Sequence, residues 1–229
     1  MTMDGIALAF DRAIELDPDY SQGLAWYCWF LLDVGYGEES LRWCERAVEL
    51  DPLRVHTLAQ YGDNLMILGR HEEGLRMLAR ALALRPDFGW PRLETAIGLA
   101  LLGRMDEAGD QLRTYARDGD LPGGEAAATT VIAALRDASL RDEAVSVVLD
   151  WINHDEHETW LLVTWLGLLD DREEALDVIE RLIEGESNGY SSIDALLIAD
   201  YLRGDPRFEA AVASLGIPDP PPDVAAIAW

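Results

Sequence analysis

A strict 34-residue periodicity constrains the fold of this chain more than any other feature of its sequence. Three kinds of landmark repeat at this interval in the first half of the chain. They are Pro18, Pro52 and Pro86; Ala13, Ala47 and Ala81; and Gly35, Gly69 and Gly103. Chance would not align three independent landmarks, so the sequence predicts an array of repeated structural units.

The residues at these landmarks indicate what each unit is. A period of this length is typical of a helix-turn-helix unit. Each glycine lies between two apolar-periodic stretches, where a chain leaving one helix needs a permissive backbone, and each proline closes the second helix. Small residues, Cys28, Gly62 and Ala96, recur at one position of the first helix, where a partner helix must approach closely.

A phrase of two acids and a small residue extends the repeat beyond the strict period. It begins at Glu38, Glu72, Asp106, Asp142 and Glu173, with the spacing loosening after the third copy. Acids in the first turn of a helix are stabilised by the helix dipole, so the phrase predicts five second-helix starts. Together with the small-residue slots and the closing Ala-x-x-Leu-x-Pro-like phrase, it resembles the tetratricopeptide repeat (TPR) family.

This resemblance implies an all-α fold. We expect a right-handed superhelical solenoid of about five TPR-like helix-turn-helix units, with an N-terminal half repeat and a C-terminal capping helix pair. The half repeat is a second-helix phrase, Asp4 to Leu16, which is either a cap or the cut edge of a longer array. We expect a regular array over 1–118, divergent TPR-like repeats over 119–185, capping helices over 186–217 and a Pro-rich tail over 218–229.

The C-terminal segment resembles the end of bacterial TPR regions that follow winged-helix regulator or nucleotide-cyclase domains. The phrase begins at Ile193 and continues through Leu202-Arg-Gly-Asp-Pro to Leu215-Gly-Ile-Pro. We expect a helix starting at Pro206, with Phe208 and Leu215 buried against the last repeat. The tail after it is either a frayed terminus or a segment whose Trp229 docks onto this molecule or a neighbour.

The net charge of −25 restricts the partners of the chain. Its 18 basic residues are all arginine and face 43 acids, with no basic cluster, so nucleic acid and anionic membranes are excluded as partners. The charge reflects either solubility and genome composition, or a high-salt habitat or basic partner. No apolar run is long enough for a membrane span, and the first residues carry an acid where a signal peptide has a base, so we expect a cytoplasmic protein.

The resemblance places a binding groove on the concave face, which the first helices line. Within the inward register positions, the predicted groove residues are Gln22, Trp29, Asp33, His56, Asp63, Met66, Ile67, Trp90, Leu93 and Ile97. The face is largely apolar with two acids, which suits a peptide or protein segment with apolar anchors and basic residues. The alternative for Trp29 and Trp90 is packing between helices. The inward positions contain no Lys, Arg or Asn, so we exclude binding of a free C-terminal carboxylate.

Other reactive residues do not form a recognisable catalytic or metal site. His154 and His157 flank two acids but lack a third ligand elsewhere, and the alternative is a solvated inter-helix loop. Cys28 and Cys44 lie on paired helices and read as buried free thiols, with a redox pair as the alternative. The sequence has no phosphate-binding glycine loop, nucleophile elbow or His-Glu-x-x-His motif, so we expect no enzyme, no metal and no cofactor.

We therefore expect a protein-interaction scaffold of the TPR type. The alternative is the sensory or regulatory arm of a bacterial signalling or transcription-regulating system, cut from or acting with an upstream domain. A third hypothesis, a homodimer formed through exposed solenoid ends, follows from the half repeat at the N-terminus. The fold predicts a groove and leaves its ligand open.

Overall fold

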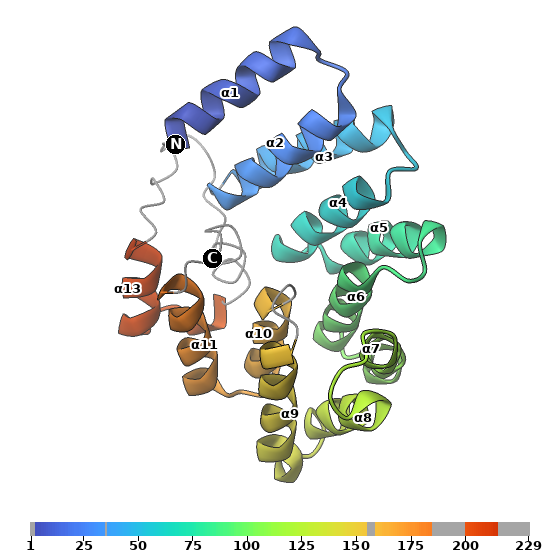
Figure 1. The fold of residues 1–229 in the computed structure, drawn as a ribbon, viewed down its shortest axis with the longest axis vertical. Coiled ribbons are helices and arrows are strands. Elements are labelled where there is room, and N and C mark those ends of the chain that lie inside the picture. The colour runs from blue at the N-terminus through green and yellow to red at the C-terminus, as the bar shows by residue number, and fades with distance from the viewer. Residues whose placement is uncertain (1–2, 35, 155–158, 185–199, 215–229) are drawn as a thin grey trace. The chain divides into compact units, whose positions relative to one another are not determined.

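The computed structural model describes residues 3–34, 36–154, 159–184 and 200–214. All regular structure in these residues is helical, which confirms the predicted all-α class (Figure 1). The described residues fall into two compact units that meet in sequence at Pro86 and Asp87, here called unit 1 and unit 2. None of the described helices is both long and apolar enough to cross a membrane.

Unit 1 contains one single helix followed by two helix pairs. Helix α2 packs against α3, α4 packs against α5, and α1 contacts α2 (Figure 1). The helices are α1 (Met3–Leu16), α2 (Ser21–Asp33), α3 (Gly37–Leu50), α4 (Val55–Ile67) and α5 (His71–Leu84). Helix α1 spans the segment that the sequence predicted to be a second-type helix.

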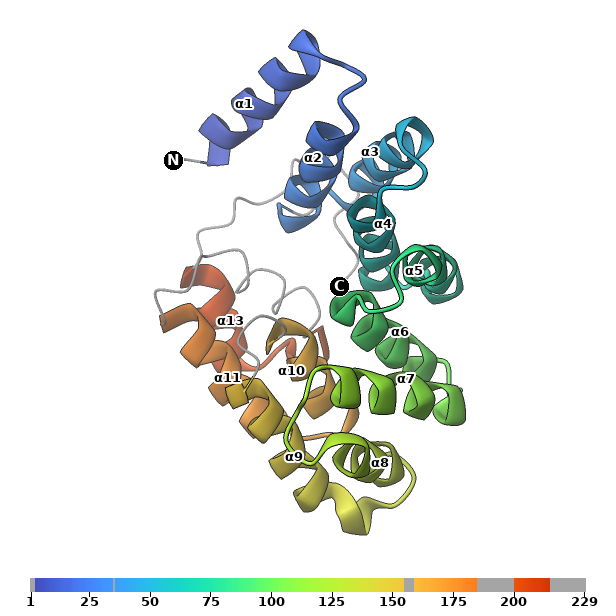
Figure 2. The same ribbon diagram turned by 45° about the vertical axis from the view of Figure 1, so that its right-hand side comes forward.

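Unit 2 contains three further helix pairs and a C-terminal segment. Along the chain, α6 packs on α7, α8 on α9 and α10 on α11 (Figure 2). The pairs are α6 (Gly89–Leu101) with α7 (Met105–Asp118), α8 (Gly124–Ala134) with α9 (Arg141–His154), and α10 (Thr159–Leu168) with α11 (Arg172–Glu184); the short helices are η1 (Ala138–Leu140), η2 (Asp200–Leu202) and α13 (Pro206–Ser214).

The acidic phrases mark the second helices as predicted. Helices α3, α5, α7, α9 and α11 each begin one residue before the first acid of a phrase. In two repeats, an arginine directly before the helix binds a glutamate in its first turn. Arg70 donates two hydrogen bonds to the carboxylate of Glu73, at 2.8 and 2.7 Å, and Arg104 donates two to Glu107 at the same distances. These contacts hold the pKa of both glutamates below its usual value.

Glycines make the turns inside the repeats because the turn needs a left-handed residue. Gly69 and Gly103 have φ of 72° and 73°. After α4, Gly69 N–H donates to the Met66 carbonyl and Arg70 N–H to the Leu65 carbonyl, which is the Schellman pattern that caps a helix C-terminus. After α10 the same pattern is kept by Asp170, with φ of 60°, where the glycine landmark has been lost. Gly35 lies outside the described residues.

The small-residue slots lie at helix crossings. Cys28 and Ala96 have no exposed surface, and Gly62 of α4 is buried against α5. A Cβ added to Gly62 would come within 2.8 Å of Leu78 Cγ, and one added to Gly74 of α5 would come within 2.8 Å of the Gly62 carbonyl oxygen. Only glycine lets these two helices approach so closely, which is the physical reason for the sequence slot.

The described C-terminal segment packs onto the last helix pair of unit 2. Helix α13 starts at Pro206 as predicted, and Phe208 is buried. Arg207 forms ion pairs with Glu173, Asp177 and Glu180 of α11, and the last two carboxylates raise the pKa of its guanidinium. Leu215, the tail 218–229, and most of the segment predicted to form the first capping helix lie outside the described residues.

Candidate functional site

Register-equivalent residues of α2 and α4 form one continuous face on each helix. In α2 they are Gln22, Trp26, Trp29 and Asp33, spaced four, three and four apart, which places them on one side of a helix. In α4 the equivalents are His56, Gln60, Asp63 and Ile67. We call the α2 set the α2 stripe and the α4 set the α4 stripe. Since α2 and α4 contact each other, the two stripes belong to neighbouring helices (Figure 2).

Exposure varies along the two stripes. Trp26 is 52% exposed, His56 is exposed, and Gln22 and Trp29 are half-buried. Asp33, at the end of the α2 stripe, and Asp63, within the α4 stripe, are only 4% and 3% exposed. The accessible part of the face is therefore aromatic and amide-bearing, and the two acids predicted to line the groove lie beneath the surface.

Two arginines, Arg54 and Arg85, lie near His56 at the accessible end of the stripes. Arg54 precedes α4 and donates from Nη1 to Gln22 Oε1 at 3.1 Å and from Nε to Asp51 Oδ2 at 3.2 Å. The bond to Gln22 links the start of α4 to α2, and the bond to Asp51 links it to the end of α3. Partial burial lowers the pKa of His56, and the positive charges of Arg85 and Arg54 lower it further, which favours the neutral imidazole near pH 7.

A buried polar network, which the sequence did not indicate, includes Gln60 and Asp63 of the α4 stripe. Asn64 Nδ2 donates to Ser40 Oγ at 2.6 Å and lies 3.1 Å from Cys28 Sγ. Gln60 Nε2 donates to Asn64 Oδ1 at 2.7 Å and to Asp63 Oδ2 at 3.4 Å. The network joins α2, α3 and α4, so it fixes the helices that carry the stripes.

The reading of Cys28 and Cys44 as free thiols is wrong in this structure. The two residues form a disulfide between α2 and α3, with their Cα atoms 5.3 Å apart. This separation is normal for a disulfide. Both side chains are fully buried, so the bond lies inside the first complete helix pair.

The remaining predicted groove residues are mostly part of the packed interior. Met66 is buried against the α5 backbone at Gly74, whereas Ile67 is half-buried. In unit 2, Leu93 has no exposed surface and Ile97 is 4% exposed. Met66, Leu93 and Ile97 are therefore buried in the interior of their units.

Trp90 of α6 meets a tryptophan from a distant part of unit 2. Its ring lies 6.3 Å from that of Trp160 of α10, centroid to centroid, and 5.7 Å from that of Phe88. Helices α6 and α10 are neighbours within unit 2. Both tryptophans are half-buried, so Trp90 takes part in packing within unit 2 as well as in its surface.

Solved structures with this arrangement of helix pairs are TPR proteins. The chain superposes on YrrB, a TPR protein with an unusual peptide-binding site, with a TM-score of 0.51 and 19% identity over 82% of this chain and 97% of that one. This chain has a TPR-like fold. A tetratricopeptide repeat protein from Parabacteroides merdae gives 0.54 and 14% over 93% and 86%, and MamA gives 0.55 and 17% over 69% and 91%.

Comparisons at the level of sequence found no counterpart. No protein-family model matches the chain, and no curated protein sequence matches it. Support for the TPR-like fold therefore comes from the repeat register and the structure. The resemblance of the C-terminal phrase to TPR regions that follow regulator domains stays a prediction.

Within the TPR-like register, sequence reasoning missed two aromatic residues. Trp26 lies four residues after Gln22 and three before Trp29, so helical spacing alone could have placed it on the same face. Its neighbour Ala25, one position earlier on the helix, is buried. Trp160 was missed because the period loosens before α10, which removes the register that would have aligned it with Trp90.

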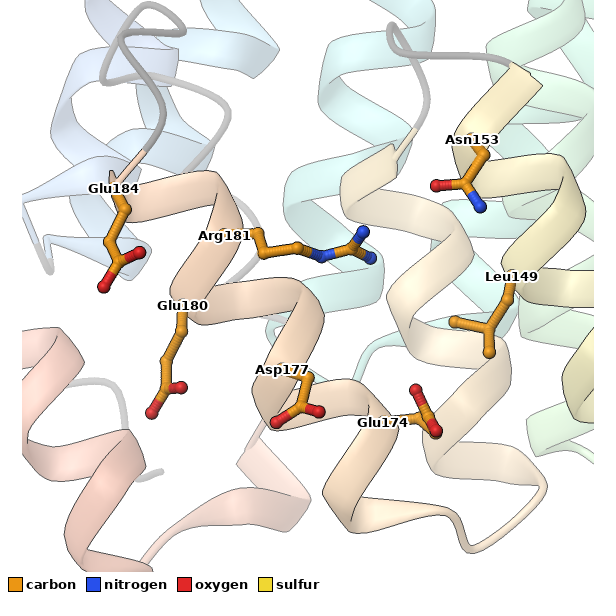
Figure 3. Close-up of a pocket in the computed structure, with 7 residues that line it drawn as sticks. All are labelled: Leu149, Asn153, Glu174, Asp177, Glu180, Arg181 and Glu184. Atoms are coloured by element: carbon orange, nitrogen blue, oxygen red, sulfur yellow. The ribbon is translucent and has the colours of Figure 1, made fainter.

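A pocket of about 450 Å³ lies between α9 and α11 of this TPR-like chain. Its lining combines one aliphatic, one amide, one basic and four acidic side chains: Leu149, Asn153, Glu174, Asp177, Glu180, Arg181 and Glu184 (Figure 3). Asp177 and Glu180 are engaged by Arg207 of α13. Much of the acidic lining therefore already serves to hold the C-terminal helix.

His154 is the last residue of α9. Residues 155–158, which include His157, lie outside the described part of the chain, so the arrangement around these histidines is not described. In the described part, no group of three or more His, Cys, Asp or Glu side chains is placed to hold a metal ion.

Proposed function

We propose that the chain is a protein-binding module and that the accessible end of the α2 and α4 stripes, Gln22, Trp26, Trp29 and His56, receives a peptide segment. The observation that carries this proposal is Trp26. A tryptophan that is 52% exposed, on the same helix face as a second tryptophan, leaves a large apolar surface in water. Such surfaces mark binding sites, and tryptophan is among the residues that contribute most at interfaces.

The polar groups beside the tryptophans suit a peptide backbone. The side-chain carbonyl of Gln22 is held by Arg54, which orients its NH₂ group as a donor for a peptide carbonyl. Neutral His56 can donate or accept, depending on its tautomer. YrrB, which shares the fold, is a TPR protein with a peptide-binding site. The proposal places a comparable role on this chain, with binding rather than catalysis as its activity.

The charge of the chain indicates the composition of the peptide. At −25, the chain attracts basic segments over distances longer than a contact, and this increases their association rate. We infer a peptide with apolar anchors for the tryptophans and with Lys or Arg outside the anchors. Because the arginines near His56 repel other positive charges, the Lys or Arg residues of the peptide should lie away from that end of the stripes.

Selection from a random peptide library tests the proposal. Peptides bound by the intact chain should be enriched in aromatic or aliphatic residues together with Lys or Arg. Trp26→Ala should weaken them by roughly 2 kcal/mol, about 30-fold, because the anchor surface is removed. Tyr20→Ala is the matched control, since Tyr20 is 47% exposed and lies off the stripe.

Two results would contradict the proposal. One is the selection of acidic peptides, which would reverse the inferred partner chemistry. The other is equal binding by Trp26→Ala and the intact chain, which would place the bound peptide elsewhere.

A further inference from the structure

The pocket between α9 and α11 is lined by more than acids. It lies within unit 2, and α10 packs against both of the helices that line it. Its volume of about 450 Å³ is in the range of small-molecule sites. Helix α13 contacts α11 as well, so the lining divides into a part that α13 uses and a part that it leaves open.

Arg207 of α13 occupies the part of the lining that is turned away from α9. Its Nη2 atom lies 2.6 Å from Asp177 Oδ1 and 2.7 Å from Glu180 Oε2, and its Nη1 atom lies 3.2 Å from Glu173 Oε2. In Figure 3 the carboxylates of Asp177 and Glu180 point away from α9. These acids hold the C-terminal helix, so the chemistry of the open part depends on the other lining residues.

Arg181 is the basic group of the open part. On a helix, Asp177 four residues before it and Glu184 three residues after it are close enough to pair with its guanidinium. No carboxylate in the described part of the chain lies within ion-pair distance of this guanidinium, however. Figure 3 shows the side chain extending from α11 toward α9 instead. Arg181 is exposed, so it can bind an anionic group of a ligand.

Asn153 of α9 lies toward the same end of the pocket as Arg181 (Figure 3). It is exposed, and its side chain forms no hydrogen bond with the residues that the structure describes. The amide NH₂ group can donate two hydrogen bonds, and the guanidinium donates through its planar fork. Donors on both sides of this end, one of them charged, suit a carboxylate.

Glu174 lies at the other end of the open part. It precedes Arg181 by seven residues, or two helical turns, which is about 10 Å along the axis of α11. Figure 3 shows its side chain on the side of α11 that faces Leu149. Glu174 is not one of the acids that Arg207 binds. Its carboxylate suits an ammonium group.

Leu149 lies between the two ends. It precedes Asn153 by one turn of α9 and is half-buried, and Figure 3 shows it at a level between Asn153 and Glu174. The order along the pocket is therefore hydrogen-bond donors, an aliphatic side chain and a carboxylate. An aliphatic chain placed over Leu149 would bury apolar surface from both partners.

The charges of the pocket favour a ligand that carries both signs. The lining has four carboxylates and one guanidinium, and Arg207 adds one positive charge. A simple anion would therefore meet a negative field, both from the pocket and from a chain with a net charge of −25. A simple cation would leave the guanidinium of Arg181 without an anionic partner. A zwitterion satisfies both ends and adds no net charge.

We propose that the open part of this pocket binds a linear zwitterion, a small molecule in which an aliphatic chain separates a carboxylate from an ammonium group. The carboxylate binds Arg181 and Asn153, the chain lies over Leu149, and the ammonium group binds Glu174. A zwitterion with both charges on one carbon, such as glycine, is too short to reach both ends. This site goes beyond the proposed peptide-binding function and does not depend on it.

Calorimetric titration of the full chain with 6-aminohexanoate tests the proposal. Hexanoate and hexylamine have the same chain length, but each carries only one of the two charges. We expect each of them to bind roughly fivefold more weakly than the zwitterion, which is the effect expected for the loss of one exposed charge contact. Glycine, which has both charges but no chain between them, should also bind more weakly.

Variants with a crossed pattern of effects assign the two ends. In Arg181→Gln, 6-aminohexanoate should bind no better than hexylamine, because the carboxylate has lost its partner. In Glu174→Gln, it should bind no better than hexanoate. Arg172→Gln and Glu173→Gln are the matched controls: they make the same charge changes on α11 outside the pocket, so they should preserve the preference for the zwitterion.

Three outcomes would overturn the proposal. The first is the absence of binding by 6-aminohexanoate, and the second is equal binding of the zwitterion and either singly charged compound. The third is an equal effect of each pocket variant and its matched control, which would assign the preference to the summed charge of the chain. Trp26→Ala should leave zwitterion binding unchanged, so a failure here is distinguishable from a failure of the peptide site.

Discussion

The crossing of α4 and α5 gives the sharpest test of the structure. Gly74 of α5 faces Gly62 of α4, and a Cβ at position 74 would lie 2.8 Å from the Gly62 carbonyl oxygen and 2.8 Å from Met66 Cγ. The methionine side chain can move aside, since Met is flexible. The carbonyl belongs to a helix backbone and cannot, so Gly74→Ala must push the two helices apart.

Two opposing effects set the size of the change. Alanine is the better helix former, by roughly 1 kcal/mol per residue. Overpacking a close-packed interior costs about 1–3 kcal/mol. Because the contact involves backbone, we place the steric effect in the upper part of that range, and the free energy of unfolding should fall by about 1–2 kcal/mol in total.

Gly109→Ala is the matched control for this measurement. Gly109 is also buried in a second helix, α7, but a Cβ there would meet only the Arg113 guanidinium at 3.0 Å and an Ile132 methyl group at 3.6 Å. The arginine end is mobile, so helix propensity should dominate and the variant should be stabilised by roughly 0.5–1 kcal/mol. Urea unfolding followed by circular dichroism measures both. Equal or greater stability of Gly74→Ala than of the intact chain would refute the close crossing.

Two further predictions concern buried groups in unit 1. Reduction of the disulfide between Cys28 and Cys44, or its removal in a double Cys→Ser variant, should lower the free energy of unfolding by about 3 kcal/mol, because the bond closes a loop of 16 residues. Thiol titration of the unfolded, unreduced chain should detect no free thiol. Burial lowers the pKa of His71, so its proton binds more weakly in the folded chain, and stability should fall as the pH drops below the unfolded value of about 6.5. Urea midpoints at pH 7 and pH 5.5 should therefore differ less for His71→Gln than for the intact chain, and an equal difference would contradict the assignment.

The repeat architecture could be predicted from the sequence because its signals are local. A left-handed turn needs glycine, a helix start favours acids, and a helix end tolerates proline, so Gly69, Glu72 and Pro86 each report a local backbone requirement. Asp170 shows the limit of this reasoning. It adopts the same left-handed conformation without glycine, so the glycine landmark does not mark the turn of this unit in the sequence.

The candidate site was less predictable because side-chain exposure depends on neighbouring helices. On a helix, adjacent residues differ by about 100° in direction, so an error of one position exchanges a surface residue for a core residue. That is the difference between Trp26 and Ala25. The disulfide was missed for another reason: the sequence places the two cysteines on paired helices, but the 5.3 Å separation of their Cα atoms depends on how α2 and α3 pack.

The burial of Asp33 and Asp63 changes how a basic partner would be recognised. The sequence suggested that these two carboxylates would pair directly with a basic residue in the groove, but at 4% and 3% exposure they face the interior. Reversing their charge would place arginine inside unit 1, so such variants would report on folding rather than on binding. A preference for basic peptides must then come from the summed field of the chain, which acts mainly on the association rate. Added salt should accordingly slow association with the peptide site while leaving its dissociation, governed by contacts with Trp26 and Trp29, nearly unchanged.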